Sequence, residues 1–222
     1  MVYTITALKA QKRNPNRINV FIDGEFGFGV SRIVAAWLSV GQIISDERIA
    51  SLKIDDELEV AYQYALKLIN YRMRSSNEVD HYLLEKGASQ ETIKSVLERL
   101  KRSGLVDDSQ FARNWTENRS EFRPRSRRAI KRELHFKGIS EDVIEKTLNE
   151  MPPEEELAYQ AGAKYARKLI FSDRFEFSRK LSGFLARRGF SYDVIKSATA
   201  RLWHERESKY SDEQDILRVE DE

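Results

Sequence analysis

The 222-residue chain contains no cysteine, and it has only four prolines and ten glycines. Without thiols it cannot form disulfide bonds or thiolate metal sites, so the reducing cytoplasm is its expected location. With few prolines and glycines it lacks most of the residues that interrupt helices, which favours a helical fold. It also has no apolar run long enough to cross a membrane and no signal stretch, and we expect a soluble intracellular protein.

Charged residues, in contrast, are abundant and unevenly distributed. Asp, Glu, Lys and Arg make up 33% of the chain, although the formal net charge is only +2. Segments 119–137 and 164–188 each contain eight basic and two acidic residues, whereas segment 205–222 contains eight acidic and three basic ones. Because local patches of one sign determine which partners are attracted, the two basic segments favour an anionic partner.

A short phrase occurs three times along the chain. It reads KGASQETIKSVL at 86–97, KGISEDVIEKTL at 137–148 and RGFSYDVIKSAT at 188–199, so the copies lie 51 residues apart. The same period links six sets of identical residues: Gly87, Gly138 and Gly189; Ser89, Ser140 and Ser191; Ile93, Ile144 and Ile195; Leu83, Leu134 and Leu185; Arg72, Arg123 and Arg174; Ala61, Ala112 and Ala163. Such a period indicates three tandem copies of one structural unit.

Each phrase fits the end of one helix followed by the start of another. The glycine suits the left-handed conformation that often follows the last turn of a helix. The serine two positions later can cap the next helix by accepting a hydrogen bond from a free backbone N–H. Apolar residues one turn apart, such as Val79 with Leu83 and Ile130 with Leu134, give the preceding helix a single buried face. Each unit is therefore predicted to contain three helices.

The fold predicted from this pattern is mainly α, with three three-helix repeats in an elongated array. Helices are expected at 56–71, 76–86 and 89–102, at 108–120, 124–137 and 140–150, and at 154–171, 174–188 and 191–206. The predicted domains are an N-terminal β-hairpin with short helices (1–54), repeat one (55–106), repeat two (107–152), repeat three (153–206) and an acidic tail (207–222).

The N-terminal region does not follow the repeat. The stretch INVFIDGEFGFGV (18–30) has two β-rich runs around Asp23-Gly24, which is typical of a short hairpin. The earlier YTITALKAQ is suited to a third strand. Ser31 and Ser45 are expected to cap two short helices that lead into repeat one.

No pattern typical of an active site stands out, so we expect neither catalysis nor a cofactor nor a metal. The spacing Gly-x-x-Gly-x-Gly at Gly24, Gly27 and Gly29 differs from the dinucleotide fingerprint, and a hairpin explains it better. The histidines are isolated from other ligands, the repeated serines are read as caps and not nucleophiles, and the tryptophans lie among apolar neighbours. We expect surface or partly buried helix positions for His81, His135 and His204, and core positions for Trp37, Trp115 and Trp203.

The basic stretch RPRSRRAIKREL (123–134) is the most informative candidate for binding. A helix that begins near Pro124 and turns Ile130 and Leu134 inward leaves its cationic side chains outside. Repeat three carries a similar cationic set. The candidate binding residues on these two basic faces are Arg125, Arg128, Lys131, Arg132, Arg179, Lys180, Arg187 and Arg188. The alternative is that they form an ordinary solvated helix surface.

The chain resembles the RecX family of bacterial regulatory proteins. The resemblance rests on GLVDDSQFARNW (104–115), on the Leu-x-x-x-Gly helix ends followed by Ser, and on the three tandem units. It implies a helical protein that lies in the groove of the RecA–DNA filament and restrains filament growth, RecA ATP hydrolysis and strand exchange, with consequences for DNA repair, recombination and the SOS response. It implies no chemistry by the protein itself. We also expect the protein to be a monomer.

Two other classes of function remain open at this point. The basic faces could hold DNA phosphates without RecA, as an autonomous DNA-binding module, or the repeats could be a scaffold for another protein. Helix-turn-helix readers need a recognition helix with base-reading side chains, and these sequences do not single one out.

Overall fold

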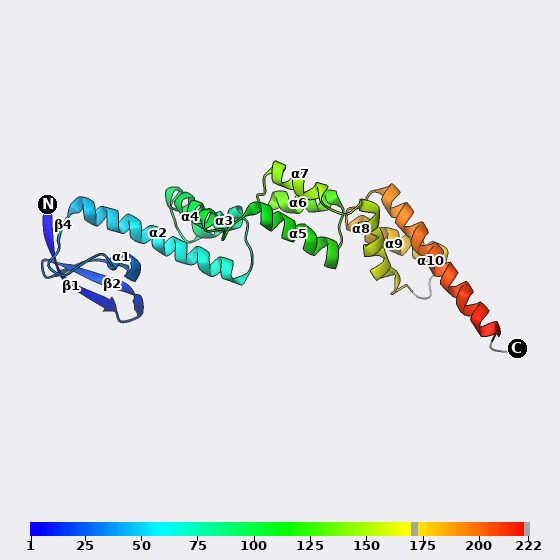
Figure 1. The fold of residues 1–222 in the computed structure, drawn as a ribbon, viewed down its shortest axis with the longest axis horizontal. Helices are drawn as coiled ribbons and strands as arrows, with labels where there is room; N and C mark the ends of the chain where they lie inside the picture. Colours follow the sequence, from blue (N-terminus) through cyan, green and yellow to red (C-terminus); the bar gives the residue numbers. More distant parts are fainter. Residues whose placement is uncertain (170–172, 220–222) are drawn as a thin grey trace. The chain divides into compact units, whose positions relative to one another are not determined.

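The computed structural model describes residues 1–169 and 173–219, with side chains described as far as residue 208. Residues Met1–Asp107 and Asp108–Glu222 form two compact units. The chain is mainly helical, with a small sheet at its N-terminus (Figure 1), as the sequence predicts. Within the described ranges, no helix combines the length and apolarity that crossing a membrane requires.

The N-terminal region is a four-stranded antiparallel sheet in the order β3-β2-β1-β4. Its strands are β1 (Val2–Gln11), β2 (Asn14–Ile22), β3 (Glu25–Ser31) and β4 (Ile43–Ser45). The hairpin predicted at Asp23-Gly24 is confirmed, since both residues have positive φ, 48° and 92°. Strand β1 confirms the third strand. Strand β4 was not predicted, because three residues are too few to show an alternating pattern.

A long helix connects this sheet to repeat one. Ser31 caps α1 (Arg32–Ala35), a short helix as predicted, and its hydroxyl accepts from the Val34 N–H. The prediction of a second short helix after Ser45 is wrong, because Ser45 caps α2 (Asp46–Tyr71), a continuous helix of 26 residues. The first helix of repeat one therefore begins ten residues before the predicted position 56. Leu52 of α2 packs in the core of the sheet.

Repeat one is completed by α3 (Ser76–Glu85) and α4 (Gln90–Arg102), which pack against α2 as Figure 1 shows. Its core contains the predicted apolar residues of each helix, including Ala61, Val79, Leu83 and Ile93. All four are almost completely buried. The predicted spacing therefore identifies the buried faces correctly.

Repeats two and three have the same three-helix plan and share one hydrophobic cluster. Repeat two contains α5 (Asp108–Phe122), α6 (Arg127–Phe136) and α7 (Glu141–Asn149), and repeat three contains α8 (Glu154–Ala166), α9 (Arg174–Arg187) and α10 (Tyr192–Val219). The cluster includes the matching pairs Ile130 with Leu134 and Leu181 with Leu185, all fully buried. The mainly α fold of three tandem three-helix repeats is confirmed.

The three repeat glycines are equivalent in conformation. Gly87, Gly138 and Gly189 follow α3, α6 and α9 with φ of 83°, 72° and 90°. Each accordingly ends a helix in the left-handed region where a side chain is disfavoured. The serine caps are less uniform: the Ser89 hydroxyl accepts from the Thr92 N–H, whereas Ser140 makes no side-chain cap hydrogen bond.

The 51-residue period does not extend to the first helix of repeat three. Ala61 and Ala112 are buried in α2 and α5, but Ala163 is only half-buried, and Ala158 is fully buried. Ala158 thus takes the position that the period assigns to Ala163. Arg174 likewise does not occupy the same structural position as Arg72 and Arg123, with which the period aligns it. Arg174 is the first residue of α9, whereas Arg123 lies before Ser126, the N-cap of α6.

Two further helix boundaries differ from the predictions. Helix α6 begins at Arg127 after the cap Ser126, so Pro124 lies in the preceding turn and not at the helix start. Helix α10 continues to Val219, beyond the predicted end at 206 and into the predicted acidic tail. Positions 170 and 171 of the predicted first helix of repeat three, and residues 220–222 of the tail, lie outside the described residues.

Candidate functional site

The basic face of repeat two is built on α6. Its cap places Ala129, Ile130 and Leu134 in the core, which turns the cationic positions toward solvent. Arg128 and Arg132 are exposed, and neither has a charged partner among the described side chains. Lys131, by contrast, forms an ion pair with Glu141 of α7. Only part of the predicted cationic face is therefore available to a partner.

Arg125 belongs to a different group of side chains, centred on Glu133. The Glu133 carboxylate accepts hydrogen bonds from the Trp115 indole N–H and the Arg119 Nε–H, both at 2.8 Å. Arg125 Nη1 lies 2.8 Å from the other oxygen of the same carboxylate. One half-buried carboxylate thus serves two guanidinium groups, and the cluster keeps a positive charge.

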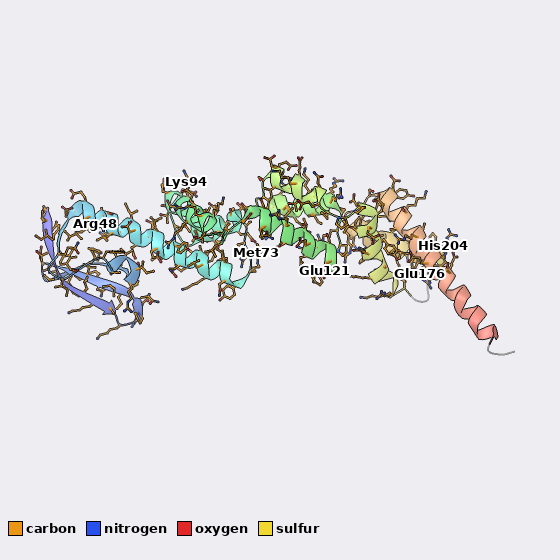
Figure 2. The ribbon with its side chains drawn as sticks, in the orientation of Figure 1. Arg48, Met73, Lys94, Glu121, Glu176 and His204 are labelled. Carbon is orange, nitrogen blue, oxygen red and sulfur yellow. The ribbon has the colours of Figure 1, made fainter. Side chains whose placement is uncertain are left out.

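In repeat three, α9 presents Arg179 and Arg187 to solvent without a charged partner among the described residues. Lys180 is paired with Glu176, four residues earlier on the same helix, at 2.8 Å. An exposed pair of this kind is weak, so Lys180 can still exchange its partner. Figure 2 marks Glu176 on this helix.

The prediction that Arg188 is an exposed surface cation is wrong, because its side chain is half-buried and connects repeat three to repeat two. It is the C-cap residue of α9, and its Nη1 donates to the Pro124 carbonyl at 3.0 Å. Its own carbonyl accepts from the Ser126 N–H at 3.2 Å, and its guanidinium lies 4.4 Å from the Phe184 ring centroid. Burial lowers the pKa of Arg188, and the neighbouring charges of Arg125 and Arg123 lower it further.

Arg123 is a further candidate binding residue, which the sequence-based set of eight cations does not include. It is exposed, it lies beside Pro124 next to Arg188, and it has no charged partner in the part of the chain that the structure describes. The signal was present, because Arg123 matches Arg72 in the repeat and both begin an Arg-x-Arg-Ser turn. Repeat matching emphasised the helix faces, and the turn between helices was not considered as a site.

Other predicted positions divide into confirmed and wrong ones. His81, His135 and His204 are exposed as predicted, and the described residues hold no cluster of acidic and histidine side chains that could bind a metal. Trp115 and Trp203 are partly buried against the core, close to the prediction. The prediction for Trp37 is wrong, since its side chain is 82% exposed just beyond α1.

The arrangement on repeats two and three is suited to binding anions. Its cations project from helix faces and from one turn held between the repeats, so the backbone that carries them is already ordered before an anion binds. Guanidinium groups can contact phosphate or carboxylate with two hydrogen bonds at once.

Family models match four successive segments of the chain. They are the regulatory protein RecX N-terminal domain at residues 3–45 and the first, second and third three-helix domains of RecX at 61–100, 107–148 and 153–199. The chain belongs to the RecX family. The RecX domains match the N-terminal sheet and the three helical repeats in order.

Individual RecX proteins are similar over almost the whole chain. Regulatory protein RecX of Bacillus subtilis (strain 168) is 30% identical over 221 residues, covering 97% of this chain and 82% of the relative. RecX of Clostridium perfringens (strain 13 / Type A) is 32% identical over 204 residues, with 89% and 95% covered. A crystal structure of regulatory protein RecX superposes with a TM-score of 0.69 at 25% identity, covering 89% of this chain and 99% of the other.

Proposed function

We propose that this protein binds the RecA–DNA filament in the cytoplasm and inhibits RecA ATP hydrolysis, strand exchange and the SOS response that depends on them. The observation that carries the proposal is the match of all four RecX domains, in order, to a chain whose second and third repeats present unpaired arginines. The protein would act as a monomer and by binding alone.

The charge distribution supports an anionic binding partner on repeats two and three. Arg128 and Arg132 of α6 and Arg179 and Arg187 of α9 are exposed and unpaired within the described residues. The corresponding helix of repeat one, α3, instead carries Glu78, Asp80 and Glu85 together with a single histidine. Both the DNA and acidic RecA surfaces would therefore be attracted to the second and third repeats.

The proposal is tested by reversing charges that have no structural role. The first variant combines Arg128→Glu with Arg132→Glu, and the second combines Arg179→Glu with Arg187→Glu. We expect each to weaken binding to preformed RecA–DNA filaments at least tenfold and to relieve inhibition of RecA ATPase, measured at matched salt. Lys131 and Arg188 are left intact, because one is paired and the other holds two repeats together.

A control variant carries the same change of charge in repeat one. Lys94→Glu with Lys101→Glu alters two exposed lysines of α4, where Figure 2 marks Lys94. This variant should bind and inhibit nearly as well as the parent protein. If the variants of repeats two and three bind and inhibit like the parent, these faces are ordinary solvated surface. Binding that is equally strong to bare DNA would instead favour an autonomous DNA-binding module.

A further inference from the structure

The turn between the first two helices is written Arg-x-Arg-Ser in both repeat one and repeat two. In repeat one the residues are Arg72, Met73, Arg74 and Ser75, and in repeat two they are Arg123, Pro124, Arg125 and Ser126. In both, the serine is the N-cap of the following helix and accepts from a backbone N–H in its first turn. The two turns are therefore the same local structure.

The two turns differ in the carboxylate that faces them. In repeat one, Glu78 completes a capping box with Ser75 and pairs with Arg72 at 2.8 Å, while Arg74 lies at 4.0 Å. In repeat two the equivalent position is Ala129, and the first turn of α6 has no acidic residue. In the turn of repeat one, the arginines are neutralised by Glu78 of the same repeat. In the turn of repeat two, the arginines have no carboxylate at the equivalent position.

Repeat three adds a further cation to the turn of repeat two. The hydrogen bond from Arg188 Nη1 to the Pro124 carbonyl holds this guanidinium at the turn, where the charges of Arg125 and Arg123 act on it. The approach is close because Gly189 follows, and a Cβ there would lie 2.6 Å from the Ser126 hydroxyl. No carboxylate among the described residues pairs with Arg188.

The result is a concentration of positive charge that the described residues do not neutralise. Among the described side chains, a single carboxylate serves Arg119, Arg123, Arg125 and Arg188. It is that of Glu133, which pairs with Arg119 and Arg125. Like charges held together cost free energy in the folded state unless a bound anion compensates for them. Arg188 is also partly desolvated, which strengthens its interaction with an anion that reaches it.

We propose that Arg123, Arg125 and Arg188 form a binding site for a backbone phosphate of a DNA strand. A phosphodiester brings its negative charge with two free oxygens, which can accept from separate guanidinium groups. A strand also carries further phosphates, which lets the exposed Arg187 contact the next one. An isolated carboxylate and an isolated phosphodiester each carry one negative charge, so the series of phosphates along a strand compensates this cluster better than a single anion does.

This site deepens the proposed function, on which it rests only for identifying the strand as DNA of the filament. The phosphate chemistry itself follows from the turn and can be measured without RecA. Binding of fluorescent single-stranded and duplex oligonucleotides is measured across a salt series for the parent protein and for Arg123→Gln. Arg123 is chosen because it is exposed and unpaired in the described chain, so its loss leaves the packing intact.

The matched control is Arg72→Gln, the same residue in the neutralised turn of repeat one. We expect Arg123→Gln to lower the slope of log affinity against log salt by about 0.7 to 0.9 and to weaken binding roughly five- to tenfold at about 0.1 M salt. Arg72→Gln should leave the slope unchanged. Circular dichroism spectra and Tm values that match the parent show that both variants are folded. A lower slope for Arg123→Gln with either single-stranded or duplex DNA supports the site, and it identifies which of the two binds there.

Three outcomes overturn the phosphate site. The first is a parent protein that does not bind DNA, and the second is an Arg123→Gln variant with the parent's slope on both forms of DNA. The third is an Arg123→Gln variant that binds DNA like the parent but no longer binds the RecA–DNA filament, which would assign the turn to an acidic surface of RecA and leave the proposed function standing. Conversely, if Arg123→Gln lowers the DNA slope but the parent does not inhibit RecA ATPase, the site stands and the proposed function fails.

Discussion

Gly189 and Gly87 share a backbone conformation but differ in their surroundings. Both have positive φ, 90° and 83°, so both resist a side chain for the same local reason. A Cβ at Gly87 would meet open space, whereas at Gly189 it would collide with the hydroxyl of Ser126 and lie 3.1 Å from the Ala129 Cβ. Gly189 thus serves both as a helix end and as the point where repeat three contacts repeat two.

Substitution by alanine should separate these two roles. Gly87→Ala is expected to lower the free energy of unfolding by about 1 to 2 kcal/mol, from the backbone conformation alone. Gly189→Ala should cost about 1 to 3 kcal/mol more, because the contact between the repeats must open as well. Urea denaturation of both variants provides the measurement. Equal losses would show that the junction relaxes without cost and would contradict the close packing.

Glu141 illustrates how an exposed side chain can still titrate abnormally. Its carboxylate pairs with Lys131, which lowers the pKa of Glu141, and His135 lies 3.0 Å away. A lowered carboxyl pKa means that this interaction stabilises the protein above the usual pKa and is lost as the pH falls through the lowered value. In Lys131→Gln we expect the Glu141 carboxyl to titrate at higher pH, measured by NMR of the side-chain carbon. An unchanged midpoint would mean that the two side chains do not pair in solution.

At the scale of elements, a partly buried ion pair joins the N-terminal sheet to α2. Asp56 of α2 accepts hydrogen bonds from the Arg17 guanidinium at 2.8 Å and from the Ser31 N–H. Arg17 also donates to the Gly29 carbonyl at 2.8 Å, so β2, β3 and α2 meet at this point. This connection fixes α2 against the sheet.

Asp56→Ala should therefore be costly. It leaves a partly buried guanidinium without its carboxylate and the Ser31 N–H without its acceptor, a loss of about 2 to 4 kcal/mol. Asp55→Ala is the matched control, because Asp55 is exposed and has no partner in the described residues. This substitution should change stability by less than about 0.5 kcal/mol. Thermal denaturation of the two variants tests the difference. Similar Tm values for both would show that Asp56 does not hold the sheet to the helix.

At the scale of the whole molecule, the protein is expected to act by binding and not by catalysis. Purified protein should neither hydrolyse ATP nor cleave DNA, and a chelator should not lower its Tm. The physical reason is that the cations of repeats two and three can neutralise phosphates but provide neither a nucleophile nor a general base. Phosphate release and DNA nicking assays measure this directly. A metal-dependent activity that disappears when one carboxylate is replaced would contradict it.

The sequence alone determined the features that depend on neighbouring residues in the chain. Leu83, Leu134 and Leu185 are fully buried, and a glycine with positive φ ends each of their helices. These positions could be predicted because helix periodicity and a left-handed glycine act over one or two turns. The hairpin at Asp23-Gly24 was predicted for the same reason. Resemblance to a family was likewise carried by short local phrases.

The tertiary structure decided which residues from distant segments meet, and therefore which charges remain free. The 51-residue period aligned Ala163 with Ala61 and Ala112, which are buried, but helix packing leaves Ala163 half-buried and buries Ala158. Eight cations were predicted to form similar exposed faces. In the structure, Lys131 forms an ion pair with Glu141, and Arg188 donates a hydrogen bond that connects two repeats. Arg123 is a candidate binding residue only because this hydrogen bond holds Arg188 at the turn that contains Arg123. Such pairings join residues separated by ten to more than sixty positions, and local periodicity carries no information about them.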